Sequence, residues 1–237
     1  MKVLNLLCSI LVILMLISSC KAPISYSNSL ISQSALDSLK TKTTRMKINP
    51  ILKIPADTTF VNLKTFSADF YYDMKYATEN NFLNAKVYNC DECYLRYSTV
   101  KYLIEANSKF MRKGFKIKLF DCYRPLTVQK KMWQILPNPK YVANPAKGSI
   151  HNRGGAVDIT LVDEQGNEVD MGTAFDYFGN ESSHLYENLS DEVIKNRKFL
   201  KKIMLKSNFK SFDSEWWHYN LKGANDNKVS DFKWLCD

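Results

Sequence analysis

Two short motifs of this 237-residue chain contain three candidate ligands for one divalent metal ion. His151 and Asp158 are separated by a stretch that contains Gly154 and Gly155, and His218 lies in the second motif. Glycines let the backbone turn sharply, so the first two side chains can reach one point. Two imidazoles and one carboxylate suit zinc and leave a fourth position for water, which is the arrangement of a catalytic zinc site. We therefore predict one zinc ion per chain.

Glu215 lies three residues before His218, and Trp216 and Trp217 stand between them. A carboxylate beside a metal site can take a proton from water, so Glu215 is the candidate general base. On a flat strand, residues three apart face opposite ways. Shared work by Glu215 and His218 therefore requires a bulge, a turn or a helical segment at this point. The alternative is an ordinary strand with core tryptophans and merely polar ends.

Two predicted strands must position these side chains. A strand over residues 157–162 fixes Asp158 to a sheet and leaves His151 on the loop before it. A second strand, over residues 215–221, carries the candidate base and the other histidine. The metal site is therefore predicted where a loop and two strands meet.

Other segments complete the predicted fold. Apolar spacing and end signals predict three helices and one more strand, over residues 95–111, 125–136, 191–204 and 115–120 respectively. Residues 66–77 also contain many β-prone side chains. Helices and strands interleave, which predicts the α+β class: a single small domain with a mainly antiparallel sheet flanked by helices.

Arg124 follows the predicted strand over residues 115–120 and precedes Pro125, a favourable first residue for a helix. An arginine at the end of a strand is well placed to bind an anion. The alternatives are an exposed arginine and an ion pair with Asp121.

The N-terminus resembles a processing signal. Lys2 is followed by an apolar run to Ile17 and by small residues before Cys20. This pattern is typical of a bacterial lipoprotein signal peptide over residues 1–19, with lipid on the thiol of Cys20. The run is shorter than the roughly 20 residues that span a bilayer, which disfavours a transmembrane anchor. The sequence thus predicts a lipid-anchored protein of the cell envelope, on the periplasmic or extracellular side of a bacterial membrane.

Residues 20–50 are rich in Ser, Thr, Lys and Asn, which predicts a flexible tether before a domain over residues 51–237. The chain has 33 basic and 24 acidic residues, a net charge of +9. Such a balance favours acidic surfaces, including anionic lipid and cell-wall polymers. Export and the lack of a nucleic-acid motif argue against nucleic acid as a partner. The sequence predicts no particular oligomeric state.

The predicted domain contains four cysteines: Cys90, Cys93, Cys122 and Cys236. Cys90 and Cys93 form a CxxC motif, but a zinc ribbon needs a second pair, which the chain lacks. A redox motif is an alternative without the usual thioredoxin context. In an exported domain, one or two disulfides are the simplest prediction, and their pairing stays open.

Five ordered motifs resemble the D-alanyl-D-alanine dipeptidases, a family that includes the dipeptidase of vancomycin resistance. They cover most of the chain from Asp69 to Leu221: Asp73-x-Lys75-Tyr76-Ala77-Thr78-x-Asn80-Asn81-Phe82, Tyr123-Arg124-Pro125, Ser149-x-His151-x-x-Gly154-x-Ala156-x-Asp158, Met171-Gly172-Thr173-x-Phe175-Asp176 and Glu215-Trp216-Trp217-His218-Tyr219. The resemblance implies a zinc metallopeptidase of small α+β fold.

The resemblance also implies roles for single residues. His151, Asp158 and His218 match the zinc ligands of the family, Glu215 matches its general base, and Arg124 matches the arginine that stabilises the transition state.

Three further residues match positions near the substrate. These are Ser149, Asp176 and, more weakly, Tyr76, and Asp176 would receive the ammonium group of a dipeptide. A turn at Gly166 and Asn167 would return the chain from the Asp158 strand towards the zinc face. Without the resemblance, Asp176 would be taken for a helix cap or an exposed acid.

The resulting prediction is zinc-dependent hydrolysis of the D-Ala-D-Ala dipeptide in cell-wall peptide metabolism, with water activated by Glu215 and the oxyanion stabilised by zinc and Arg124. One alternative is a zinc D,D-carboxypeptidase or endopeptidase that trims peptidoglycan stem peptides. Another is a non-catalytic, wall-binding lipoprotein. The complete set of candidate catalytic residues disfavours the last, and Asp176 favours the dipeptidase over the carboxypeptidase.

Overall fold

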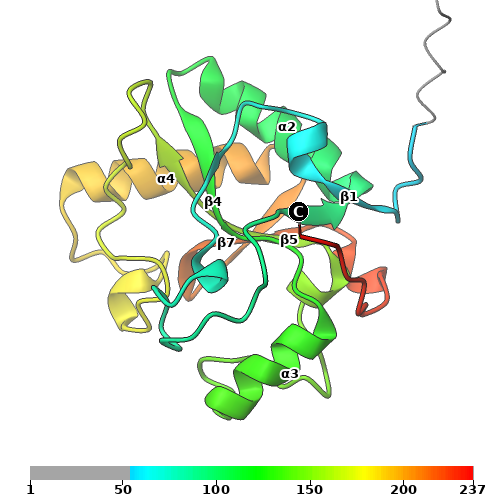
Figure 1. The fold of residues 1–237 in the computed structure, drawn as a ribbon. Coiled ribbons are helices and arrows are strands. Elements are labelled where there is room, and N and C mark those ends of the chain that lie inside the picture. Colours follow the sequence, from blue (N-terminus) through cyan, green and yellow to red (C-terminus); the bar gives the residue numbers. More distant parts are fainter. Residues whose placement is uncertain (1–53, 237) are drawn as a thin grey trace, which may run out of the picture. The chain divides into compact units, whose positions relative to one another are not determined.

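A computed structural model describes residues 54–236. The predicted signal peptide, Cys20 and the tether lie outside these residues. From Ile54 onward the chain forms one compact unit, built on a five-stranded sheet (Figure 1). No described helix is both long enough and apolar enough to cross a membrane.

The order of strands in this sheet is β2-β4-β5-β7-β6. The strands span β2 (Tyr71–Tyr72), β4 (Lys116–Asp121), β5 (Ala156–Val162), β6 (Phe209–Phe212) and β7 (Glu215–Leu221). Only β2 and β4 pair in parallel, and the other three pairings are antiparallel. A second, two-stranded antiparallel sheet joins β1 (Phe60–Asn62) to β3 (Tyr94–Arg96). The predicted α+β class with a mainly antiparallel sheet is confirmed.

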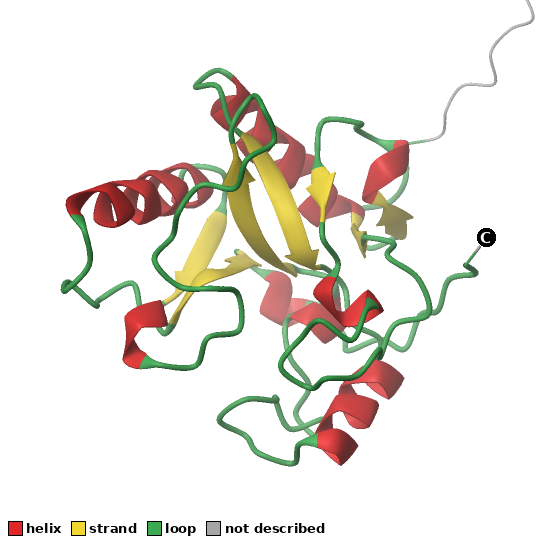
Figure 2. Cartoon of the chain, turned by 60° about the vertical axis from the view of Figure 1, so that its left-hand side comes forward, coloured by secondary structure: helices red, strands yellow, loops and turns green. Residues whose placement is uncertain are grey.

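The described part of the chain has three helices (Figure 2): α2 (Tyr97–Met111), α3 (Leu126–Ile135) and α4 (Asp191–Leu205). Both α2 and α4 pack on strands of the sheet and on each other. The side chain of Ser190 accepts a hydrogen bond from the amide of Val193, which caps the start of α4. Each helix lies where the apolar spacing predicts it, although Pro125 caps α3 rather than opening it.

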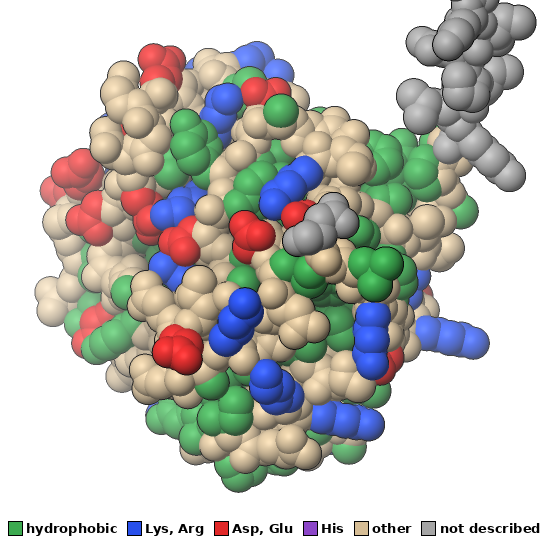
Figure 3. Space-filling view, in the orientation of Figure 1, with side chains coloured by type: hydrophobic (Ala, Val, Ile, Leu, Met, Phe, Trp, Pro, Cys, Tyr) green, Lys and Arg blue, Asp and Glu red, His purple; other side chains and the backbone are tan. Residues whose placement is uncertain are grey.

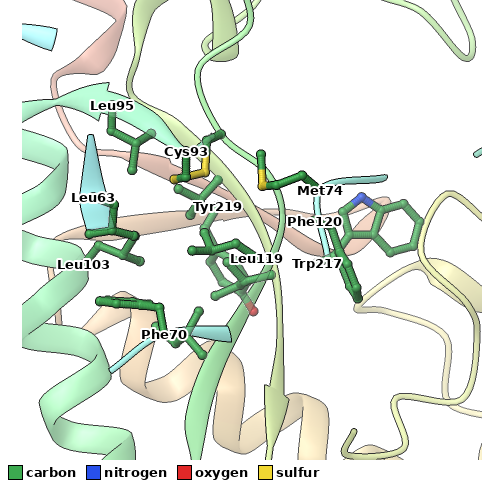
Figure 4. Close-up of a cluster of buried hydrophobic side chains, with 14 of the residues drawn as sticks. Leu63, Phe70, Met74, Cys93, Leu95, Leu103, Leu119, Phe120, Trp217 and Tyr219 are labelled. Atoms are coloured by element: carbon green, nitrogen blue, oxygen red, sulfur yellow. A yellow bond between two sulfur atoms is a disulfide. The ribbon is translucent and has the colours of Figure 1, made fainter. Parts of the chain in front are cut away.

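The core lies between the sheet and α2 and α4 (Figure 4). Strand β5 is buried along its whole length, so both of its faces are covered. Its neighbour β7 buries both Trp216 and Trp217, each 1% exposed. Because these two strands carry candidate metal ligands, the candidate metal site lies on the most buried part of the sheet.

The β-prone segment over residues 66–77 forms little strand. Only Tyr71–Tyr72 forms a strand, and Lys75–Ala77 forms a 3-10 turn. Phe70 and Tyr76 are instead buried among core side chains, 6% and 2% exposed. Aromatic residues that raise the β propensity of this segment thus serve packing, and only its two strand residues pair with β4.

Candidate active site and metal centre

The fold brings the three candidate metal ligands together. His151 begins a 3-10 turn (His151–Arg153) immediately before β5, whereas Asp158 lies on β5 and His218 on β7. Asp158 and His218 are direct cross-strand partners. One ligand atom from each of the three residues can be chosen so that all lie within 4.8 Å of one another. The sequence prediction of a site between one loop and two strands is therefore met by the geometry.

The distances between these atoms are short. Nε2 of His151 lies 3.2 Å from Nδ1 of His218 and 3.4 Å from Oδ2 of Asp158. Nδ1 of His218 lies 2.9 Å from Oδ1 of Asp158. Two nitrogens and a carboxylate thus converge on one point, a donor set that zinc accepts with an open fourth position. The residues present fit a catalytic zinc ion.

The remaining ring nitrogens of the two histidines have acceptors of their own. Nδ1 of His151 donates to the backbone carbonyl of Cys122 at 2.7 Å, and Nε2 of His218 donates to Oδ1 of Asn220 at 2.9 Å. With these protons so assigned, Nε2 of His151 and Nδ1 of His218 are left for the metal. Sequence analysis missed Asn220, although its place two residues after His218 puts it on the same side of β7.

Charge within the site keeps Asp158 ionised. Burial by itself would raise the pKa of this carboxyl, but the adjacent imidazoles of His151 and His218 outweigh burial and hold the pKa below its usual value. Burial would likewise lower the pKa of His218, and its hydrogen bond to Asp158 reverses the direction. The negative carboxylate of Asp158 thus faces the imidazoles, which must be neutral to ligate a metal ion, so zinc would compete with protons at this centre.

The pairing of β6 and β7 is irregular between Glu215 and His218. Ser211 pairs with Tyr219, but the next residue, Phe212, pairs with Glu215. One step along β6 therefore corresponds to four along β7, which confirms the predicted irregularity between Glu215 and His218. Burial, aided by the charge of Asp158, raises the pKa of Glu215.

Arg124 is buried and held in a fixed position. Its Nε and Nη2 donate to Oδ2 of Asp121 at 3.2 and 2.6 Å, and its Nη1 donates to Oε1 of Gln129 at 3.0 Å. The guanidinium carbon also lies 5.2 Å from the ring centre of Tyr76. The ion pair with Asp121 that was left open as an alternative therefore exists, and it orients an arginine that is only 7% exposed.

Asp121, predicted only as a possible ion-pair partner of Arg124, also contacts other groups of the site. It is fully buried, and its Oδ1 accepts hydrogen bonds from the hydroxyl of Tyr88 at 2.7 Å and from the amide of Cys122 at 2.9 Å. Its Oδ2 lies 3.6 Å from Nδ1 of His151. The carboxylate therefore links the candidate oxyanion-binding Arg124 to a metal ligand. Its place at the end of a strand, three residues before Arg124, was the available signal.

Tyr76 and Asp176 meet although they are 100 residues apart in the chain. The hydroxyl of Tyr76 donates to Oδ2 of Asp176 at 2.8 Å. The predicted return of the chain is present, since Val162 bridges Glu168 in antiparallel fashion. Burial, and more weakly the charge of Asp158, raises the pKa of Asp176. This carboxyl is largely enclosed and has no cationic partner within hydrogen-bonding distance among the described residues.

Two cavities open beside these groups. One, of about 420 Å³, includes Asp176 and Phe175 in its lining, and the other, of about 480 Å³, includes Glu215 and Lys140. Tyr177 lines both cavities. Asp176 and Glu215 are therefore each reached from a cavity large enough for a small molecule.

Ser149 lies near the site but is engaged locally. Its amide and hydroxyl both contact Oδ1 of Asn152, at 2.7 and 3.1 Å. The side chain of Asn152 in turn donates to the backbone carbonyl of Arg124 at 2.7 Å. Ser149 thus shapes the loop that carries His151. Among the described residues it makes no hydrogen bond to Asp176 or Tyr76.

His184 is not the exposed residue that its polar neighbours suggest. Its ring is partly buried and lies 6.2 Å from the ring of Tyr219. Burial, together with the positive charges of Lys201 and Arg197, lowers its pKa to about 4. It takes no part in the group of candidate metal ligands found among the described residues.

Basic side chains form no continuous patch on the face seen in Figure 3, where acidic and neutral side chains separate them. On this face the basic side chains are therefore dispersed rather than gathered over one element.

Comparisons with known proteins agree with the site. The family described as "D-ala-D-ala dipeptidase" matches residues 56–234. The D-alanyl-D-alanine dipeptidase of Escherichia coli is 36% identical over 171 residues, which are 71% of this chain and 88% of that protein. The D-alanyl-D-alanine dipeptidase of Enterococcus faecium is 31% identical over 172 residues, which are 64% of this chain and 85% of that protein.

Similarity to solved structures is more distant. A structure titled "VanYB in complex with D-Alanine-D-Alanine" has 14% sequence identity and a TM-score of 0.37, over 56% of this chain and 75% of that chain. At this level it adds nothing to the assignment, which follows from the match over residues 56–234 and the relative at 36% identity. The chain belongs to the D-Ala-D-Ala dipeptidase family of zinc metallopeptidases.

Proposed function

We propose that this protein hydrolyses the free D-Ala-D-Ala dipeptide in cell-wall peptide metabolism. The observation that carries the proposal is the convergence of His151, Asp158 and His218 within 4.8 Å of one another, as expected for zinc ligands. Zinc, when bound, supplies a Lewis acid that makes water a nucleophile near neutral pH and polarises the peptide carbonyl. The other steps fall to side chains around this centre.

Glu215 accepts the proton of the attacking water and delivers it to the leaving amine. Its raised pKa supports this role, because a base that must later give the proton back works best with a pKa near the operating pH. It also lines a cavity, so water and substrate can reach it.

Arg124 stabilises the negative charge that forms on the carbonyl oxygen. The contacts to Asp121 and Gln129 fix the guanidinium before substrate arrives, so little reorganisation is needed during the reaction. One such preorganised donor is typically worth about 3–4 kcal/mol of transition-state stabilisation.

Asp176 selects for a free dipeptide by binding its ammonium group, with Tyr76 holding one carboxylate oxygen in place. A buried carboxylate without a cation is costly, and a substrate ammonium compensates that cost. An N-acylated peptide brings no positive charge and would leave Asp176 against a neutral amide. Ser149 contributes by shaping the loop at the edge of the substrate site.

A second candidate is a D,D-carboxypeptidase that trims stem peptides. The cavity of about 420 Å³ beside Asp176 favours it, since a longer peptide could extend there. The two functions differ in their need for a free amine. We therefore compare free D-Ala-D-Ala with its N-acetylated form at equal concentrations of zinc-loaded enzyme. Rapid release of D-Ala from only the free dipeptide supports the proposal. Equal rates on both would replace the dipeptidase with the carboxypeptidase.

We further propose that the enzyme is exported and held at the membrane by lipid on Cys20. The support is the small-residue motif before Cys20, together with two disulfides in the folded domain, which suit an oxidising compartment. The Cys20→Ser protein should be released in soluble form. If it still partitions with membranes as the wild type does, the apolar run of residues 3–17 is itself the anchor.

A further inference from the structure

One of the two disulfides lies against the metal centre. Cys93 immediately precedes β3 and Cys122 immediately follows β4, and both are fully buried. Their sulfurs are bonded across a sequence separation of 29 residues. Figure 4 shows the sulfur of Cys93 among the buried side chains of Leu95 and Tyr219. The bond thus joins the small β1-β3 sheet to the strand end from which Arg124 extends.

The backbone of Cys122 touches two groups of the site. Its carbonyl accepts the hydrogen bond from Nδ1 of His151 at 2.7 Å. Its amide donates to Oδ1 of Asp121, the carboxylate that holds Arg124. A shift of Cys122 would therefore move the acceptor that fixes the ring of a zinc ligand, as well as the support of the oxyanion-binding arginine.

The segment that starts at Cys93 also holds the other side of the His151 turn. The amide of Arg96 and the hydroxyl of Thr99 both donate to the carbonyl of Gly154, at 3.0 and 2.8 Å. Gly154 has φ of +71°, and a Cβ there would come within 2.5 Å of the ring of Phe60. The turn that carries His151 is therefore enclosed by β1, β3 and the start of α2.

We propose that the Cys93–Cys122 disulfide is a positioning device for the zinc ligand His151, which it serves by fixing the carbonyl that orients the imidazole. The inference rests on the proposed zinc function and adds residues that the family resemblance does not assign. Partners that orient a metal-bound histidine typically contribute 10–100-fold to metal affinity. The acceptor here is a backbone carbonyl, so it is held by the cross-link together with the adjoining backbone hydrogen bonds from Tyr123 to Tyr94 and from Arg124 to His151.

The second disulfide supplies a matched control. Cys90 and Cys236 are bonded across 146 residues, and neither makes a hydrogen bond to the three candidate ligands. In the chain-entropy account, the bond that closes the longer loop stabilises the fold more. If disulfides affected zinc only through general stability, removal of Cys90–Cys236 should lower zinc affinity at least as much as removal of Cys93–Cys122.

The experiment compares the Cys93→Ala/Cys122→Ala protein with the Cys90→Ala/Cys236→Ala protein. Zinc affinity is measured by competition with a chelator, at a temperature where circular dichroism shows both proteins to be folded. We expect a loss of roughly 10–100-fold for the first and less than about twofold for the second. Equal affinities in the two proteins, or a larger loss in the second, would overturn the proposal.

A second measurement covers the case in which the Cys93→Ala/Cys122→Ala protein does not fold. The Cys90→Ala/Cys236→Ala protein keeps only the Cys93–Cys122 bond, so its zinc affinity is compared before and after reduction with a phosphine, with thiol titration showing that this bond is open and circular dichroism showing that the protein stays folded. We expect a loss of roughly 10–100-fold on reduction, and unchanged affinity would contradict the proposal. Both readouts are independent of substrate. A failure to cleave D-Ala-D-Ala would therefore sink the proposed function and leave this inference to its own test.

Discussion

Asp158 and His218 face each other directly across β5 and β7, and Oδ1 of the aspartate lies 2.9 Å from Nδ1 of the histidine. Two of the three proposed zinc ligands thus come from paired positions on adjacent strands, Asp158 buried and His218 partly exposed. His151, on the adjoining turn, is fixed instead through the carbonyl of Cys122. The centre is therefore built on rigid elements on two sides and on a braced loop on the third.

The ligand assignment predicts the effect of removing each histidine. His151→Ala and His218→Ala should each lose both zinc and activity, because two remaining ligands do not hold the ion tightly. Metal analysis after dialysis should give about one zinc per wild-type chain and far less in either variant. His184→Ala is the control, since His184 lies outside the group of ligands and should keep zinc. Full activity in thoroughly metal-stripped wild-type protein would refute the assignment.

Glu215→Gln should keep zinc and the fold but lower kcat about 10²–10⁴-fold, because the general base is lost while the ligands remain. The raised pKa of Glu215 adds a pH signature. Activity needs the ionised base, so it should fall with decreasing pH through a value above the ordinary 4.5. The control Glu187→Gln, at an exposed position, should change neither kcat nor its dependence on pH. Loss of zinc from Glu215→Gln would show that Glu215 is a ligand instead.

Arg124→Ala should lower kcat about 10²–10³-fold, the usual effect of removing one preorganised donor to an oxyanion. Arg124→Lys should rescue little, because an ammonium cannot reproduce the forked contacts to Asp121 and Gln129. Asp121→Asn should be destabilised by about 3–5 kcal/mol, since it leaves a buried arginine without its counter-charge. Urea unfolding checks the stability, and steady-state kinetics checks the rates. Wild-type activity in Arg124→Ala would remove Arg124 from the mechanism.

His184 predicts how stability depends on pH. Its pKa is about 4 in the folded chain and near 6.5 in the unfolded chain, so acid protonates the unfolded chain first. The contribution of the neutral ring is complete above pH 6.5 and is lost progressively as the pH falls to about 4. Between pH 7 and pH 4, the free energy of unfolding should therefore fall less in the His184→Gln protein than in the wild type, by up to about 3 kcal/mol. Parallel stability curves for the two proteins would contradict this.

Much of the fold follows from local patterns in the sequence. Strand β7 begins and ends where its apolar run predicts, and α4 begins at the acidic pair Asp191 and Glu192. The ligand candidates were identifiable because the chain has only three histidines. Two of these histidines, His151 and His218, lie in motifs that also contain a carboxylate. The need for an irregular β6-β7 pairing followed from side-chain alternation alone.

Other features depend on contacts between distant segments. The disulfide partners Cys90 and Cys236 are 146 residues apart, and no local pattern sets their pairing. The contact of Tyr88 with Asp121 spans 33 residues and becomes visible only once the strands are assembled. The polar neighbours of His184 predict exposure, whereas its ring packs near Tyr219. Such relationships are set by tertiary packing, which local propensity does not encode.

The most direct test of the account is the ratio of kcat/KM for free D-Ala-D-Ala to that for a stem pentapeptide ending in D-Ala-D-Ala. It is measured with zinc-loaded wild-type protein and with Asp176→Ala. We predict that wild type favours the dipeptide by at least about 10²-fold, because the pentapeptide leaves Asp176 without a cation, a cost of several kcal/mol. Asp176→Ala should lose activity on the dipeptide. Equal kcat/KM values for the two substrates in the wild-type protein would contradict the account.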